Sequence, residues 1–390
     1  MKFSIPAKDL KRALSTCNEI APVSSAIAEE KTGVLIRAQG EFVVFMSSDD
    51  TSYASVTVPA KVKTEGEALV RCSAVSGSVS ATFLEDDKTI TVETTDKESL
   101  KISGVSTVKH NRTFPLLNAG FFVETPEFDE AQATRIEALA LQDGILAVAH
   151  AASKDASKLH FNCVSTTFTD NEIVFAATDG VQIAEFRKTV KVPKQGLRGS
   201  FILGLKFANV MAKYVADVLR EGDTEGMVGI YVEKDNFFLR SGGTVLVGIL
   251  LNTSFPDYVE HLETAEKLLA VFPGKEFLSV LAGMQPTVDT KSHRMVVEAS
   301  DGGQAALSNS SNSGASESSE LPVQTSASFV LHFDALLLQT AIRQLYALKK
   351  VKEEETEFEF YFTEKAAHVI LKLPKHDYFK TLVCTLKPVS

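Results

Sequence analysis

The sequence has few cysteines and no long apolar stretch. Cys17, Cys72, Cys163 and Cys384 lie far apart and form no CxxC pair, and a chain of 390 residues does not need disulfides to be stable. We therefore expect free thiols and a reducing, cytoplasmic compartment. No apolar run reaches the ~20 residues that span a bilayer, and the first residues lead directly into a charged amphipathic segment. Secretion and membrane insertion are not expected.

Basic residues are outnumbered by acidic ones. The chain has 40 Lys and Arg against 50 Asp and Glu, a formal net charge of −10, which disfavours a protein that binds nucleic acid through a uniformly basic surface. A local basic lining is still compatible with this balance. The 44% hydrophobic and 23% charged content is typical of a globular protein, and at roughly 150 residues per domain the length predicts two or three domains.

The chain also lacks a recognisable catalytic or metal-binding constellation. Its eight histidines are scattered, and no zinc spacing, P-loop or GxSxG elbow is present. Two acidic pairs or runs, Asp49–Asp50 and Glu85–Asp87, could in principle hold a divalent cation, but turn and hairpin positions explain them better. We predict no metal site, no cofactor and no enzymatic activity; a hydrolase with a site between domains is the weakest interpretation.

What the chain does contain is a threefold internal repeat. Three segments each carry an apolar strand, a Ser or Thr, an Asp, an Asp or Gly, and an Ala five residues after the first Asp. They are residues 43–54, 173–184 and 295–306, with the anchoring residues Asp49, Asp179 and Asp301. In the second and third copies the residue after the Asp is Gly180 or Gly302. The spacing of the anchors predicts three domains of similar length.

Each repeat begins with a helix signal, an apolar stripe at helical spacing. The stripes are Leu10, Ala13, Leu14 and Cys17; Leu141, Ile145, Val148 and Ala149; and Phe277, Val280, Leu281 and Met284. A second helix is predicted around Phe207–Val218 and Leu338–Leu345, and more weakly over Ser73–Ser80, which is rich in serine. Alternating strands follow each second helix. The pattern predicts an α+β fold in which two helices of each repeat pack on antiparallel sheets.

The repeat also sets the expected domain boundaries, at residues 1–127, 128–264 and 265–390. The first two repeats end on a matching Phe-Pro, Phe114–Pro115 and Phe255–Pro256, where we expect proline to end a strand. The serine-rich stretch Ser308–Ser319 predicts a flexible loop at about residues 307–326, inserted in a hairpin of the third domain. A plain solvated loop is favoured over a phosphorylated regulatory segment.

Basic residues gather on the predicted helices despite the negative total. Lys8 and Arg12 lie opposite the apolar stripe of the first helix, Lys206 and Lys213 lie on the fourth, and Arg343 lies on the sixth. Solvated helix faces explain each case taken alone. If three similar units share one orientation, however, these side chains form a common surface that could follow a phosphate backbone without reading bases.

Several motifs together give a family resemblance. Four features resemble the bacterial DNA polymerase III beta subunit, the sliding clamp. They are the opening Met1–Ile5 followed by Leu10–Leu14, the turn Ala177–Gly180, the segment Phe255–Tyr258 and the threefold repeat. The resemblance covers the whole chain. It implies a DNA clamp fold of three repeated domains and a head-to-tail homodimer that closes into a ring around duplex DNA.

The resemblance also implies partners. Such a protein is not a catalyst: it tethers the replicative DNA polymerase, is opened and closed by a clamp loader, and recruits other proteins through short clamp-binding peptides. An alternative is a divergent clamp-like scaffold or decoy that binds polymerase peptides without encircling DNA. The implied DNA-facing residues are Lys206, Lys213, Arg12, Lys8 and Arg343.

The resemblance further implies a peptide-binding pocket. Carried over by position, it comprises Phe161, Thr178, Gly180, Val181, Gln182, Ile183, Pro256, His261, Leu382, Val383, Cys384, Thr385 and Leu386. Where the family has His-Arg-Leu after this turn, the chain has Val181–Ile183, so a charged contact is missing. A few apolar contacts can carry most of the affinity for a peptide. Without the resemblance, these residues would be read as the core of a domain junction.

Overall fold

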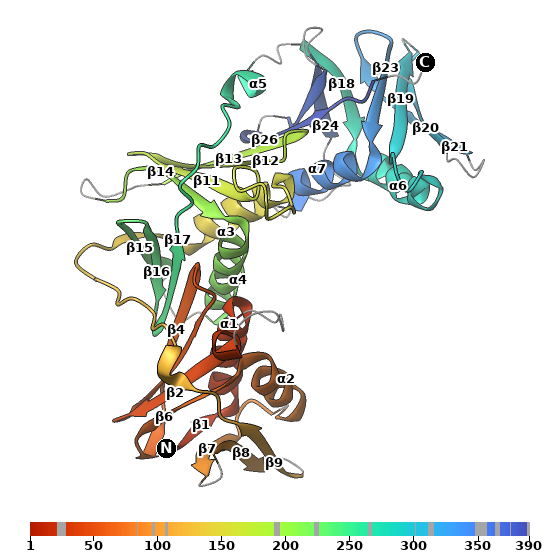
Figure 1. The fold of residues 1–390 in the computed structure, drawn as a ribbon. Coiled ribbons are helices and arrows are strands. Elements are labelled where there is room, and N and C mark those ends of the chain that lie inside the picture. Colours follow the sequence, from red (N-terminus) through yellow and green to blue (C-terminus); the bar gives the residue numbers. More distant parts are fainter. Residues whose placement is uncertain are drawn as a thin grey trace. The chain divides into compact units, whose positions relative to one another are not determined.

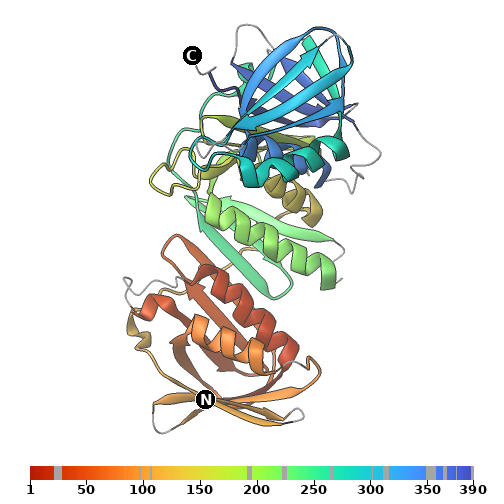
Figure 2. The same cartoon turned by 90° about the vertical axis from the view of Figure 1, so that its right-hand side faces the viewer.

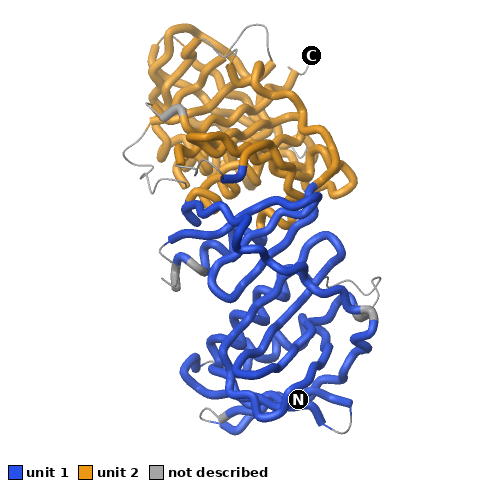
Figure 3. The backbone as a smooth tube through the Cα atoms, turned by 90° about the vertical axis from the view of Figure 1, so that its left-hand side faces the viewer, with its two compact units in different colours: residues 1–139, 192–197, 210–250 blue, residues 140–191, 198–209, 251–390 orange. Residues whose placement is uncertain are grey.

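The computed structural model describes most of the chain. The described residues are 1–21, 29–83, 85–95, 98–105, 108–190, 196–221, 226–263, 267–300, 302–310, 316–347, 357–362, 367–374 and 376–387. Within these ranges, no helix is both long and apolar enough to cross a membrane. The chain divides into two compact units (Figure 3): unit 1 holds residues 1–139, 192–197 and 210–250, and unit 2 holds residues 140–191, 198–209 and 251–390.

Unit 1 is built on two antiparallel sheets (Figure 1). The first has the order β5-β1-β7-β8-β9, with β1 (Lys2–Pro6), β5 (Lys61–Thr64), β7 (Thr89–Thr95), β8 (Ser99–Val105) and β9 (Lys109–Pro115). The second has the order β10-β15-β16-β17-β4-β3-β2-β6, with β2 (Gly33–Gln39), β3 (Phe42–Ser48), β4 (Ser52–Pro59), β6 (Gly66–Arg71), β10 (Thr134–Glu137), β15 (Met227–Glu233), β16 (Asn236–Ser241) and β17 (Thr244–Ile249).

Two helices of unit 1 run alongside each other on its sheets (Figure 2): α1 (Ala7–Ile20) and α2 (Cys72–Thr82). The predicted stripe of α1 is fully buried at Leu10, Leu14 and Cys17 and packs with Phe3 and Phe45 in one core. The weakly predicted second helix of the first repeat is therefore confirmed as α2. Unit 1 also contains residues 210–221 of α4 (Leu205–Glu221), of which Met211 and Tyr214 are buried.

Unit 2 has a nine-stranded and a four-stranded antiparallel sheet. The larger has the order β14-β11-β12-β13-β26-β25-β24-β18-β22, with β11 (Cys163–Phe168), β12 (Glu172–Thr178), β13 (Gln182–Thr189), β14 (Gly199–Gly204), β18 (Lys267–Pro273), β22 (Gln324–Thr325), β24 (Glu357–Phe362), β25 (His368–Leu373) and β26 (His376–Cys384). The smaller has the order β21-β20-β19-β23, with β19 (Arg294–Ser300), β20 (Gln304–Ser310), β21 (Ser316–Pro322) and β23 (Phe329–Asp334).

The helices of unit 2 bury the predicted stripes. They are α3 (Ala138–Val148, with residues 140–148 in this unit), α5 (Val259–Glu263), α6 (Gly274–Met284) and α7 (Ala335–Ala347). Phe277 of α6 lies edge-on to Phe272 and Phe358, with ring centroids 4.9 and 5.1 Å apart, in a fully buried aromatic cluster. Val280 is only partly buried, and Leu278 occupies the core in its place.

The repeated turns confirm the repeat but differ in the third copy. Asp50 and Gly180 both have positive φ angles, of 70° and 95°, in four-residue connections between paired strands. In the third copy the pair Ser300↔Gln304 leaves three residues, and the positive φ of 75° falls on Gly303 rather than on the predicted Gly302. Asp301 itself lies outside the described residues.

Two further expectations are wrong. The serine-rich stretch is not an inserted loop, because β20 and β21 pair along it from Gln304↔Pro322 to Ser310↔Ser316, and only residues 311–315 lie outside the described part. Buried Leu307 and Leu321 anchor these strands on the sheet, and serines alternate with them. Pro115 does end β9, but Phe255–Pro256 lies in the segment between β17 and α5 and ends no strand.

Candidate functional site

The candidate site is a pocket of about 250 Å³ that lies entirely within unit 2. Five short stretches line it, and its lining residues are Phe161, Thr178, Gly180, Val181, Gln182, Ile183, Pro256, Asp257, Tyr258, His261, His368, Leu382 and Cys384. The volume suits a few apolar side chains of a ligand. The pocket is open at the surface, since Val181 is 48% exposed while Leu382 at its base is 2% exposed.

The turn between β12 and β13 forms one wall of the pocket. Asp179 Oδ1 accepts hydrogen bonds from the backbone N–H groups of Val181 and Gln182, at 2.9 and 3.0 Å, which fixes the turn. Glycine is favoured at position 180 because its φ of 95° strains other residues; the space itself would admit a Cβ, which would lie in ordinary contact with Phe161 Cζ at 3.4 Å. The same turn thus presents Val181 beside Phe161.

The pairing of β13 with β26 places the C-terminal strand at the pocket. Ile183 pairs with Leu382, and the N–H of Cys384 donates to the Val181 carbonyl at 2.9 Å. Thr381 Oγ1, fully buried, donates to the Ile183 carbonyl at 3.1 Å. Because side chains alternate along a strand, Leu382 and Cys384 share the face that lines the pocket and Val383 lies on the other.

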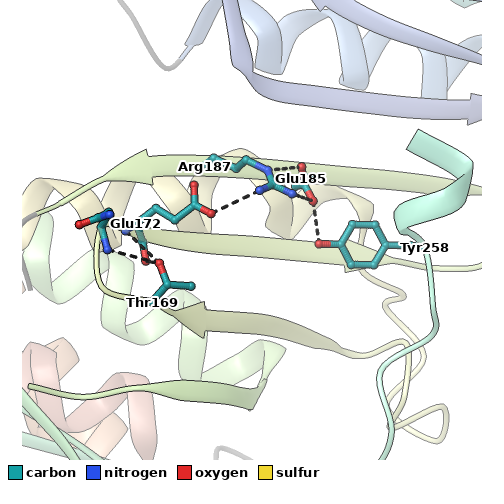
Figure 4. A network of polar contacts seen from close by, with 6 residues as sticks. Thr169, Glu172, Glu185, Arg187 and Tyr258 are labelled. Carbon is teal, nitrogen blue, oxygen red and sulfur yellow. Dashed lines mark hydrogen bonds and ion pairs between the residues drawn. The ribbon is translucent and has the colours of Figure 1, made fainter. Parts of the chain in front are cut away.

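The segment before α5 is held to the sheet by Tyr258 (Figure 4). Its hydroxyl donates to Glu185 Oε2 at 2.8 Å, and Arg187 Nε donates to Glu185 Oε1 at 2.8 Å. Burial, reinforced by the Glu185 carboxylate, raises the pKa of Tyr258 well above its usual value, and the pairing with Glu185 raises the pKa of Arg187. This ion-paired network positions the wall that contains Pro256 and Asp257.

Several titratable groups near the pocket are kept uncharged by burial. Desolvation, followed by the proximity of His261, lowers the pKa of His368, whose ring lies 6.1 Å from that of His261. Burial lowers the pKa of His150, in the short helix η3 (Ala149–Ala151), to about 4. Burial also raises the pKa of the Cys384 thiol. The pocket is therefore a largely apolar site in which these buried groups are uncharged, and Asp257 contributes an exposed carboxylate to its lining.

The structure brings ten of the thirteen predicted pocket residues together. They are Phe161, Thr178, Gly180, Val181, Gln182, Ile183, Pro256, His261, Leu382 and Cys384. Three predicted residues do not line the cavity: Val383 is buried on the opposite face, and the N–H groups of Thr385 and Leu386 donate to Ala367 and His332 as the chain leaves the sheet. These three residues lie outside the lining of the cavity, and their part in peptide binding stays a prediction.

Three lining residues were missed by the sequence reasoning. Asp257 and Tyr258 lie inside the Phe255–Tyr258 motif itself, so the motif could have supplied them. His368 comes from β25 and lies opposite Cys384, a position set by strand register that no motif signals.

The predicted DNA-facing cations all lie on helices. Lys8 and Arg12 are on α1, Lys206 and Lys213 on α4, and Arg343 on α7. All are exposed except Arg12, which is half-buried and lies 3.7 Å from Asp9. Lys213 pairs with Glu19 of α1. Their placement on solvent-facing helix surfaces is as expected, and their contact with DNA stays a prediction.

The acidic residues that suggested a cation site have structural partners. Asp49 Oδ1 accepts from Thr51 N, Thr51 Oγ1 and Ser52 N, which is the role of a turn residue. Asp86 pairs with Lys11 at 2.8 Å. In the part of the chain that the structure describes, no three His, Cys, Asp or Glu side chains gather as a metal site would need. The four cysteines are free, and burial raises the pKa of Cys17 to about 12.

Comparisons with known proteins agree with this architecture. Residues 135–257 match the family model of the DNA polymerase III beta subunit, central domain. The chain is 21% identical over 304 residues to a beta sliding clamp of Chlamydia muridarum, which covers 77% of this chain and 78% of that protein. The fold matches the DNA polymerase III beta subunit of Thermotoga maritima with a TM-score of 0.87 at 17% identity, over the full length of both chains.

A sliding clamp of Pseudomonas aeruginosa solved bound to griselimycin matches with a TM-score of 0.84 at 16% identity, again over both full chains. Repeated units of two helices on antiparallel sheets, joined by strand pairing between repeats, define the DNA clamp fold. Within that class, the resemblance seen in the sequence is confirmed as a similarity: residues 135–257 match the DNA polymerase III beta subunit family, and the whole chain has the fold of solved sliding clamps.

Proposed function

We propose that this chain is a DNA sliding clamp, which encircles duplex DNA without sequence preference and tethers the replicative polymerase. The observation that carries the proposal is the match of the whole chain to the clamp fold, together with relatives that are themselves beta sliding clamps. The function is topological rather than catalytic. Its partners are DNA, the polymerase, a clamp loader and a second copy of the chain, and it acts in the cytoplasm, where bacterial chromosomes are replicated.

The edge strands supply a way to close a ring from two copies. β9 is the outermost strand of the five-stranded sheet and exposes Lys109 and Arg112; β21 is the outermost strand of the four-stranded sheet and carries Glu317 and Glu320. Outer strands present unpaired backbone groups that can pair with another chain. Opposite charges on the two edges favour β9 of one copy against β21 of the other, and disfavour like edges together.

The helix cations suit weak contact with DNA. Arg12 and Lys213 each have a carboxylate neighbour in the same unit, Asp9 and Glu19, so part of their charge is compensated. Surface ion pairs such as that of Lys213 contribute at most about 1 kcal/mol, so phosphate groups can compete for the cation at little cost. Weak, non-specific contacts allow a ring to slide, whereas tight phosphate binding would hold it in place.

Lys206→Glu tests the DNA-facing assignment. Reversal of one exposed charge on α4 should weaken retention on nicked circular DNA several-fold, because an attraction to phosphate becomes a repulsion, and should leave the dimer intact. Lys61→Glu on β5 makes the same charge change on a sheet strand and should leave retention unchanged. Equal effects of the two variants would remove Lys206 from the DNA-facing set.

The function itself is tested by topology. Labelled protein loaded onto nicked circular DNA should stay bound through gel filtration and should be lost when one restriction cut linearises the circle. A scaffold that only binds peptides would be retained on neither form. Retention that survives linearisation would indicate ordinary binding and would contradict a clamp.

A further inference from the structure

The two ends of the pocket come from different places in the nine-stranded sheet. The strand order β11-β12-β13-β26-β25 runs from one end to the other. Phe161, just before β11, lies at the first end, and His368 of β25 lies at the second with His261 of α5, their rings 6.1 Å apart. Four steps of ~4.8 Å separate β11 from β25, roughly 19 Å in all. An extended segment of about six or seven residues spans this distance.

The loop at the Phe161 end is basic. Lys154 and Lys158 are both exposed, and the loop folds back onto Phe161. The N–H of Ser153 donates to the Phe161 carbonyl at 2.9 Å, and the N–H of Phe161 donates to the Lys158 carbonyl at 2.9 Å. The one acidic residue of this loop, Asp155, is held by two hydrogen bonds from within the loop. The loop therefore presents a net positive charge beside the apolar lining.

The end formed by α5 and the segment before it is acidic. Asp257, Glu260 and Glu263 are exposed, and residues 256–263 contain no lysine or arginine. Asp257 itself lines the pocket. The N–H of His261 donates to the Tyr258 carbonyl at 3.1 Å, so the first turn of α5 is continuous with the pocket wall that Tyr258 fixes to β13 (Figure 4). These carboxylates therefore lie at the rim, where a ligand can reach them.

The charged groups between the two ends are engaged within the protein. Asp179 accepts hydrogen bonds from its own turn, and Glu185 is ion-paired with Arg187. Lys387, beyond the C-terminal strand, lies at β19, where its carbonyl accepts a hydrogen bond from Arg294 at 2.7 Å. The pocket is thus an apolar channel with a basic rim at one end and an acidic rim at the other.

We propose that the pocket orients its partner by charge. The partner is an apolar segment with an acidic flank, which lies over Lys154 and Lys158, and a basic flank, which lies over Asp257, Glu260 and Glu263. The inference rests on the proposed function, in which partner proteins bind at this pocket, and adds the chemistry and the direction of the bound segment. The reversed order of flanks places like charges together at both ends, so the pocket selects one order over the other.

The test compares three N-acetylated, C-amidated heptapeptides. All share a central Leu-Phe-Leu, which has the same order in both directions. One has Glu-Glu before this centre and Lys-Lys after it, the second has the two flanks exchanged, and the third has glutamine at all four flanking positions. Isothermal titration with the full chain should give one charged peptide a higher affinity than the glutamine peptide and the other a lower one. The two should differ by about three- to tenfold, as expected for several exposed charge pairs.

Salt separates charge from shape as the cause. In about 1 M NaCl, where the Debye length is ~3 Å, the difference between the two orders should disappear, and the glutamine peptide should keep its affinity. Equal affinities of the two charged peptides at low salt, or a difference that persists at high salt, would overturn the inference while the pocket assignment stands. No binding by any of the three would overturn both, and DNA retention would still test the clamp separately.

Charge reversal at the rim locates the effect. The rim variant combines four substitutions at exposed residues: Lys154→Glu, Lys158→Glu, Glu260→Lys and Glu263→Lys. It should bind the three peptides with the preferred order reversed. The control variant combines Lys291→Glu with Glu298→Lys, two exposed positions just before and on β19, and should keep the original preference. An original preference that survives in the rim variant would contradict the proposed charges.

Discussion

The two places where one repeat joins the next are built alike and filled differently. In unit 1, β4 pairs with β17 and Tyr53 lies opposite Val247; in unit 2, β13 pairs with β26 and Ile183 lies opposite Leu382. The first junction is packed by rings. Tyr231 and Phe238 stack with centroids 4.4 Å apart, and Phe128 lies edge-on to Tyr231 at 5.0 Å.

The second junction has an aliphatic centre and an open pocket. Ile183, Leu382, Ile370 and Leu262 form its buried cluster, Tyr258 and Tyr361 pack against this cluster, and Tyr258 donates to Glu185. The backbone construction is shared, so side-chain volume decides whether a junction serves only as core or also offers a binding surface. Residues of the first junction should affect stability, and residues of the second should affect ligand binding.

The largest effect is expected from Phe238→Ala in the first junction. Phe238 is 2% exposed within the ring stack, and removal of a buried phenylalanine costs about 3–5 kcal/mol of unfolding free energy. Hydrogen exchange of the β16 and β17 amides measures the loss within unit 1. Phe42→Ala, at a residue that is 49% exposed, is the control and should change stability by less than about 0.5 kcal/mol. A similarly small loss of unfolding free energy in Phe238→Ala would contradict the claim that the first junction serves stability.

The second junction should be the one whose stability falls at acidic pH. His150, whose carbonyl holds Gln182, has a folded-state pKa of about 4, below its ordinary 6.5, because of burial. As the pH falls, His150 is therefore protonated in the unfolded chain before it is protonated in the folded chain. Its contribution to the free energy of unfolding is fully present above pH 6.5 and is lost as the pH drops toward 4, by up to about 3 kcal/mol. His368 adds to this loss in the same direction.

Urea unfolding of His150→Gln between pH 4 and pH 7 checks this prediction. The variant is expected to be less stable at pH 7 but to lose less stability on acidification than the unmodified chain. Carboxylates with lowered pKa values, such as Glu93 and Glu124, are common to both proteins, so their titration cancels in the comparison. Parallel pH profiles for the two proteins would show that His150 does not titrate as described.

The smallest effect on stability, and the sharpest contrast, comes from two tyrosine-to-phenylalanine changes. Tyr258→Phe removes the hydrogen bond to Glu185, and Tyr231→Phe removes the acceptor for Asp129 N at 3.0 Å; each should cost about 1 kcal/mol. Tyr258→Phe alone should weaken binding of a short apolar peptide to the pocket, because it loosens the wall that contains Pro256 and Asp257. Titration of both variants with that peptide decides the matter, and equal affinities would mean that the network does not position the pocket.

Much of the fold could be predicted because the periodic spacing of apolar residues is kept even where sequence identity to the known proteins is low. The apolar stripe of α1 predicted its buried face, and even α2, with its serines and Gly77, formed where the repeat required a helix. The serine-rich hairpin could not be predicted from composition, since its strands depend on pairing and on the two buried leucines, Leu307 and Leu321.

The pocket residues divide in the same way, into those that a sequence motif predicts and those that only strand pairing places. Its turn residues follow one another in the sequence, and a motif finds them. His368 reaches the pocket only through the register of β25 against β26, and Val383 is excluded by alternation in that same strand. The functional role of the site residues therefore remains a prediction that peptide titration must test.

The central claim is that two copies close into a ring, and one experiment measures this most directly: sedimentation equilibrium combined with small-angle X-ray scattering on the free protein. We predict a mass twice that of the 42.3 kDa chain and a hollow scattering profile. Reversal of the charge of Arg112 on β9 alone, or of Glu317 on β21 alone, should abolish both, and a variant in which the two residues are exchanged should restore them. A single-copy mass of 42.3 kDa at concentrations where the protein is retained on circular DNA would contradict the account.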